Sequence, residues 1–239
     1  MSMDTKMADS VESVQNLIKN LSGKAKQGQE EELEAMQDYA NSRGFEGDLD
    51  IFDIEYFRRK QRRTILGISD EDLSEYFPMP TVLNGLFNVC SYLFDIDFEE
   101  VDVNGEAWHP DVKCFACKDL KTGQVLGHFY LDAYVREEKG YAGGDYGWYM
   151  PLRSKSKVGP SLPLGAMVFA LAPPKVGKPS LLTFFEVKEL FHKFGMVLQH
   201  LLCESDYSDL NGRSALEKDV FDFVGDFMCQ LMHNPQVIR

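Results

Sequence analysis

Apolar residues near the N-terminus recur at helical spacing in two stretches. Residues 8–22 place Val, Leu and Ile side chains three and four positions apart, and residues 30–44 form a second helical segment that ends at Gly44. The intervening segment "SGKAKQGQ" (22–29) is rich in turn-forming residues. The pattern therefore predicts a helical hairpin over residues 1–47.

Three further helical segments follow before residue 96. Residues 50–67 begin at a capping Asp, and the segment 68–77 has Ser69 followed three positions later by Asp72, which is close to a capping box. Residues 78–95 start with prolines and continue with an amphipathic pattern. We expect all three to be helical.

The pattern changes to strand-like runs in the second half of the chain. Residues 112–119 and 125–135 are rich in strand-forming side chains and are separated by the turn sequence "LKTG", which predicts a β-hairpin. Residues 165–174 favour a buried strand closed by prolines. The Gly- and Tyr-rich segment 140–151 is typical of a surface loop.

A long helix is predicted near residues 183–203, and a final helix near residues 217–233. The first of these carries a single apolar stripe made of Val187, Leu190, Phe191, Phe194, Val197, Leu198 and Leu201. The fold class is therefore mainly α with a small β-sheet, an α+β arrangement. We divide the chain into the hairpin over residues 1–47 and a second domain over residues 48–239.

Charge and composition exclude several classes of function. Of the 239 residues, 38 are acidic and 25 are basic, and the net charge of −13 argues against a nucleic-acid partner. The one basic run, "FRRKQRR" (57–63), is interpreted as a solvated helix face. No apolar run reaches the roughly 18 residues that a membrane helix needs, and no signal or transit peptide is recognised in the first residues. These features predict a cytoplasmic protein without a membrane partner.

The cysteines do not indicate a disulfide framework or a metal knuckle. There are five, an odd number scattered along the chain, which is typical of reduced thiols in an intracellular compartment. Cys114 and Cys117 form a lone C-x-x-C inside a predicted strand, where residues three apart point to opposite faces. We therefore interpret both as structural.

The segment "FHKFGMVLQH" (191–200) nearly spells the H-E-x-x-H signature of zinc peptidases. His192 holds the first His position, but Lys193 stands at the Glu position and Met196 at the second His position. A charged lysine has no acceptor for a proton from water, and a thioether suits Cu(I) better than Zn(II). From spacing alone, His192 is a histidine on an amphipathic helix.

Longer segments carry a resemblance to a known family. The chain resembles the thimet oligopeptidase and oligopeptidase A family of zinc metallopeptidases, especially its plant members, in several segments that occur in the same order: "EYFPMPTVLNGLF" (75–87), "LGHFYLDAYVREEK" (126–139), "KPSLLTFFEV" (178–187) and "LEKDVFDFVGDFM" (216–228). The resemblance implies a zincin-like part of a helical catalytic domain built around a channel, with zinc as cofactor and short peptides as substrates.

The resemblance also indicates which residues occupy the family's site positions. His192 matches the first zinc ligand, Lys193 the general base, Met196 the second zinc ligand, and Asp222 the third ligand, normally Glu. At most His192 and Asp222 remain as metal ligands, so zinc is expected to be absent or weakly bound, and no catalytic set is intact. Tyr146 and Tyr149, in the Gly-rich segment, are expected to contact peptide.

The resemblance covers about the middle third of a family member and omits a later Tyr- and His-bearing loop that stabilises the transition state. We therefore expect a truncated, catalytically inactive oligopeptidase-like protein that acts by binding a peptide, a full-length relative or another protein. The alternatives are a metallo-oligopeptidase that hydrolyses short peptides through an altered metal site, and a degenerate gene product with no selected role.

Overall fold

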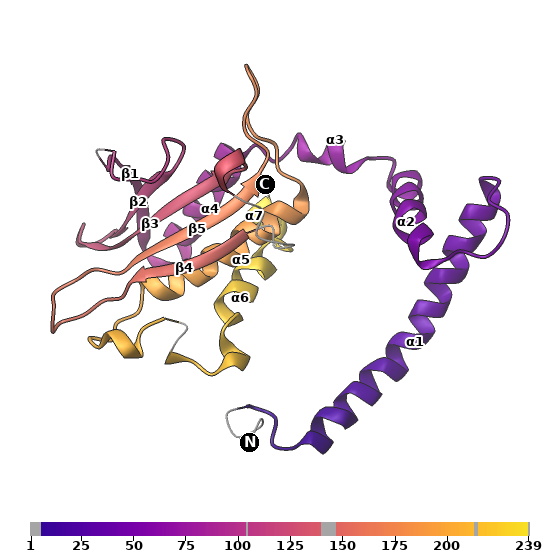
Figure 1. Ribbon diagram of the computed structural model, residues 1–239, viewed down its shortest axis with the longest axis horizontal. Helices are drawn as coiled ribbons and strands as arrows, with labels where there is room; N and C mark the ends of the chain where they lie inside the picture. The colour runs from indigo at the N-terminus through magenta and orange to yellow at the C-terminus, as the bar shows by residue number, and fades with distance from the viewer. Residues whose placement is uncertain (1–5, 104, 140–146, 213–214, 239) are drawn as a thin grey trace. The chain divides into compact units, whose positions relative to one another are not determined.

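The computed structural model describes residues 6–103, 105–139, 147–212 and 215–238, and Figure 1 shows its elements. The chain divides into two compact units, residues 1–72 and 73–239. The helix α3 (Asp70–Ser74) contains the boundary between them. Within the described residues the fold class is α+β, as predicted, because several helices accompany one five-stranded sheet.

The first unit contains the helices α1 (Val11–Ser42) and α2 (Ile51–Leu66). They pack through a small core of Met36, Ala40 and Phe57. The predicted break at residues 22–29 is wrong, because α1 runs through it without interruption. Gly23 and Gly28 each cost about 1 kcal/mol relative to Ala, but the good helix formers between them keep the helix intact.

Local capping defines α2 as the sequence predicted. Asp50 caps the helix in a capping box with Asp53, and the helix ends at Gly67, whose φ of 67° is the left-handed conformation that glycine adopts readily. Ser69 and Asp72 then form the reciprocal hydrogen bonds expected of them: the Ser69 backbone N–H donates to Asp72 Oδ2 and the Asp72 N–H donates to Ser69 Oγ.

The second unit is built on a five-stranded sheet with the order β1-β2-β3-β5-β4. Its strands are β1 (Ile96–Val101), β2 (Lys113–Asp119), β3 (Val125–Tyr134), β4 (Gly147–Arg153) and β5 (Leu164–Leu171). The predicted hairpin is confirmed as the antiparallel pair β2–β3, and β5 lies parallel to β3. The prediction of a loop is wrong at 147–151, which belongs to β4; residues 140–146 lie outside the described part of the chain.

Two helices share one face of this sheet. The helix α4 (Met79–Phe94) brings Phe87 against Phe98, Phe115 and Phe129 of the strands, and α5 (Phe184–Leu201) brings Phe194 against the same cluster. Figure 1 shows α4 and α5 along the sheet. The core therefore lies between the sheet and these two helices.

The helix α6 (Phe223–Leu231) packs against α5, and the short helix α7 (Pro235–Ile238) follows it. The final helix was predicted to begin near residue 217, which is wrong because residues 218–220 form a 3₁₀ turn and α6 begins six residues later than expected.

Candidate functional site

The helix α5 carries the candidate site and is fixed at its start by a capping box. The Glu186 backbone N–H donates to Thr183 Oγ1 at 3.2 Å, and the Thr183 N–H donates to Glu186 Oε2 at 2.7 Å. Together these bonds satisfy two donors that a helix N-terminus otherwise leaves unpaired. The predicted apolar stripe from Val187 to Leu201 is buried in the core. The helix thus has a fixed rotation, which directs His192 away from the sheet.

Two glycines allow α6 to approach α5 closely. A Cβ atom on Gly195 would lie 2.5 Å from the Val224 carbonyl oxygen and 2.7 Å from the Gly225 Cα. A Cβ atom on Gly225 would lie 2.9 Å from the His192 carbonyl oxygen and 3.0 Å from its Nε2. Larger side chains would force the helices apart, so this crossing sets the position of α6 beside His192.

His192 is mostly buried and faces a carboxylate of α6. Its Nε2 lies 3.3 Å from Asp226 Oδ1, and its side chain is 17% exposed. Its Nδ1 is buried and has no hydrogen-bond partner among the described residues. The sequence analysis missed Asp226. The signal in the sequence was its position four residues after Asp222, which places the two on the same face of a helix. In the structure, the Asp226 backbone N–H donates to the Asp222 carbonyl oxygen at 2.7 Å.

The residues at the other family positions have different partners. Lys193 Nζ lies 3.7 Å from Glu189 Oε2, one helical turn earlier. Met196 is only 4% exposed. Asp222 precedes the first residue of α6 and is exposed. An ammonium group and a buried thioether therefore stand one and four residues after His192.

These side chains do not fit a catalytic zinc ion. Such an ion takes three protein ligands from His, Cys, Asp or Glu, and the described residues contain no group of three or more that could hold a metal. A ligating histidine also donates its second ring N–H to an acceptor, whereas the Nδ1 of His192 lacks one among the described residues. That His192 and Asp222 bind metal weakly stays a prediction.

The second histidine of α5, His200, contacts the strand β4 and supports the fold. It is buried, and its Nε2 lies 2.9 Å from the Arg153 carbonyl oxygen at the end of β4. Burial lowers the pKa of His200, and hydrogen bonds to the backbone offset this effect only in part. The His200 ring also lies 6.1 Å from the ring of Tyr149. This contact links α5 to the edge of the sheet.

The strand β4 forms that edge and carries one of the predicted peptide-contacting residues. Tyr149 is half-buried on β4, between the exposed side chains of Trp148 and Met150. Tyr146 lies outside the described residues. Because β4 pairs with β5 on one side and is last in the strand order, its other side faces away from the sheet. A β-edge of this kind can pair with an extended peptide.

A buried ionic cluster precedes this edge in the chain, and the sequence analysis did not single it out. Asp132, on β3, accepts two hydrogen bonds from Arg136 at 2.6 and 2.9 Å, one from Lys139 at 2.9 Å and one from the Trp108 indole at 2.8 Å. Lys139 also donates to the carbonyls of Asp132, Tyr134 and Phe169. Burial acts to raise the pKa of Asp132, but these hydrogen bonds outweigh it and lower the pKa to about 2.

Comparison with known proteins identifies the family. The family model for peptidase family M3 matches residues 1–239. The chain belongs to peptidase family M3. It is 33% identical to organellar oligopeptidase A from Arabidopsis thaliana over 95% of its length, 33% identical to oligopeptidase A from Escherichia coli over 99%, and 34% identical to a probable cytosolic oligopeptidase A from Arabidopsis thaliana over 95%.

The chain spans only part of the length of these relatives: 29%, 34% and 33%, or about a third. The family resemblance read from the sequence is therefore confirmed. The names of the relatives include both cytosolic and organellar proteins, so they do not decide the compartment. In the part of the chain that the structure describes, none of the helices has the length and apolar character required to span a bilayer.

Proposed function

We propose that this family M3 chain binds extended peptides without hydrolysing them. The observation that carries the proposal is the surroundings of His192. The neighbouring Lys193 is an ammonium donor beside Glu189, and the side chain one turn further on is the thioether of Met196. Neither group can hold zinc as a histidine does or accept a proton from water as a glutamate does. Without a second zinc ligand and a proton acceptor at these positions, the chain lacks the groups with which a zinc peptidase activates water.

Peptide binding requires less than hydrolysis, and the edge of the sheet supports the proposal. Among the described strands, β4 pairs with β5 alone, so the backbone groups on its other side are not paired with a described strand, and Trp148 and Met150 offer partly exposed apolar surface on β4. An added strand gains main-chain hydrogen bonds, and alternate side chains give selectivity. A cytoplasmic location, and a full-length relative or another protein as partner, remain part of this proposal.

The alternative is a metallo-oligopeptidase with an altered metal site. The proximity of His192 to Asp226 favours it, because an imidazole and a carboxylate could hold one cation between them. Both readings are tested with internally quenched fluorescent peptides of 8–20 residues, with zinc added and with chelator as control. The variant His192→Ala is compared with His233→Ala, which changes an exposed histidine outside α5 and α6.

Binding is measured separately by fluorescence anisotropy of a labelled peptide. We expect no cleavage, together with binding that weakens when alternate peptide nitrogens of the ligand are methylated and cannot donate. Chelator-sensitive cleavage that disappears in His192→Ala and persists in His233→Ala would establish the alternative. The absence of both cleavage and binding would leave the third reading, a product without a selected role.

A further inference from the structure

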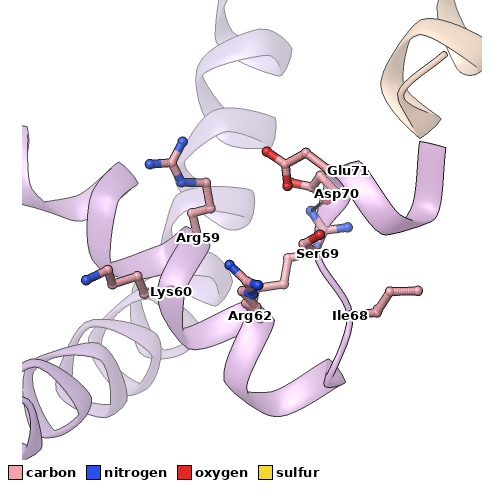
Figure 2. Close-up of a pocket in the computed structure, with 8 residues that line it drawn as sticks. Arg59, Lys60, Arg62, Ile68, Ser69, Asp70 and Glu71 are labelled. Carbon is pink, nitrogen blue, oxygen red and sulfur yellow. Dashed lines mark ion pairs between the residues drawn. The ribbon is translucent and has the colours of Figure 1, made fainter. Parts of the chain in front are cut away.

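The first unit contains a cavity whose chemistry differs from that of the chain as a whole. It has a volume of about 300 Å³, and its lining includes four cationic side chains of α2: Arg59, Lys60, Arg62 and Arg63. Figure 2 shows Arg59 and Lys60 on the α2 side of the cavity and Ser69, Asp70 and Glu71 on the opposite side. The basic run is therefore more than a solvated helix face, because it forms one wall of a pocket.

The lining carries four cationic side chains and two carboxylates, those of Asp70 and Glu71, so positive charge is in excess by two. Arg62 pairs with Asp70 at 3.5 Å, and Lys60 lies over the ring of Tyr56 at 4.5 Å. In the described part of the chain, neither Arg59 nor Arg63 takes part in an ion pair. Because they are four residues apart on one helix, their like charges repel each other. An anion between them would relieve that repulsion.

The opposite wall is held in place by its own hydrogen bonds. The Ser69 hydroxyl donates to Asp72 Oδ2 at 2.6 Å, and the Ser69 backbone N–H donates to the same oxygen at 3.0 Å. These bonds, and to a smaller extent the charge of Arg63, lower the pKa of the Asp72 carboxyl. The Ser69 hydroxyl is thus committed to Asp72, so the guanidinium groups of α2 remain as the donors for a ligand.

We propose that this cavity binds the phosphate monoester group of a small molecule. Each guanidinium presents a planar fork of N–H donors that matches two oxygens of a phosphate. A phosphate monoester carries about −1.5 to −2 charges near neutral pH and has three acceptor oxygens, so its charge can offset those of Arg59 and Arg63 together. A carboxylate carries only one charge, so it would offset the charge of one of the two arginines and leave that of the other.

The test is a titration of the full chain, followed by the arginine Nε–Hε signals in ¹⁵N–¹H correlation spectra. The probes are inorganic phosphate, a nucleoside monophosphate and a sugar phosphate, each compared with sodium chloride at equal ionic strength. The variant carrying Arg59→Gln and Arg63→Gln is compared with Arg58→Gln, a matched control on the same helix. Arg58 pairs with Glu55 and is not part of the cavity lining.

We expect the Arg59 and Arg63 signals to shift and saturate with the phosphate probes, and not with chloride. The double variant should weaken binding by at least about tenfold, since each lost charge-assisted bond removes a large part of the interaction. Arg58→Gln should bind as the unmodified chain does. Saturation by inorganic phosphate alone identifies a free-phosphate site, and tighter binding of one ester identifies an organic phosphate. Shifts that grow linearly for every arginine, an equal loss in Arg58→Gln, or no shift would each overturn the proposal.

Discussion

The buried cluster around Asp132 permits a quantitative prediction for the change Asp132→Asn. Asp132 is 2% exposed, and its carboxylate accepts hydrogen bonds from Arg136, Lys139 and Trp108. An asparagine retains the size of the side chain but removes the charge. Lys139 and Arg136, whose side chains are 9% and 16% exposed, would then lack their anionic partner. Removing one member of such a buried pair costs about 3–5 kcal/mol.

The pKa of Asp132 gives a second, independent measure of how much its carboxylate stabilises the folded chain. It is about 2 in the folded chain, against a value near 3.9 for an unperturbed Asp. The difference corresponds to about 2–3 kcal/mol of stability. Because the folded pKa is the lower one, this stabilisation is fully present above about pH 4 and is lost as the pH falls toward 2. Asp132→Asn should therefore cost most near neutral pH, and the cost should shrink in acid.

Urea unfolding followed by tryptophan fluorescence measures both effects. The two tryptophans, Trp108 and Trp148, lie in the second unit, so the signal reports that unit. The matched control is Glu100→Gln, which breaks an exposed pair with Lys113 and should cost no more than about 1 kcal/mol. If Asp132→Asn costs no more than this control at pH 7, or if its cost does not decrease between pH 4 and 2, the reasoning about the cluster is refuted.

Two other predictions concern packing and thiol chemistry. Gly195→Ala should destabilise the second unit by about 1–3 kcal/mol in urea unfolding, because the added Cβ would meet the backbone of α6. The control is Gly85→Ala in α4, where an added Cβ would have no atom within 4 Å. This control should be neutral or stabilising. Burial raises the pKa of Cys90 and of Cys117 to about 12, so mass spectrometry after iodoacetamide treatment at pH 8 should find both unmodified in the folded chain and modified in urea. Rapid modification of either thiol in the folded chain would contradict the burial of these two side chains.

The elements that could be predicted from the sequence are those fixed by local chemistry. The capping residues of α2, the turn between β2 and β3, and the apolar stripe of α5 all lie within short stretches of chain. The error at residues 147–151 arose where a distant partner decides the structure. The glycines and tyrosines of residues 140–151 indicated a loop, yet β5 pairs with residues 147–153 to form β4, and Pro151 is tolerated because this strand is at an edge.

The candidate site was located from the sequence only as far as its helix. The resemblance placed His192, Lys193 and Met196 together on one helix, and they lie together on α5. It could not give their partners, because these depend on where α6 crosses α5. That crossing depends on Gly195 and Gly225, and it brings Asp226 next to His192.

Two hydrogen bonds near the edge strand do not involve the residues that differ from the zinc peptidase pattern. Lys139 donates to the Phe169 carbonyl on β5, which pairs with β4, and His200 bonds to the carbonyl of Arg153 at the end of β4. None of these contacts involves Lys193 or Met196. Substitutions at those two positions can therefore remove hydrolysis without removing a partner of either hydrogen bond. This separation of support from chemistry is the physical reason why a member of this family could lose catalysis and still bind peptides.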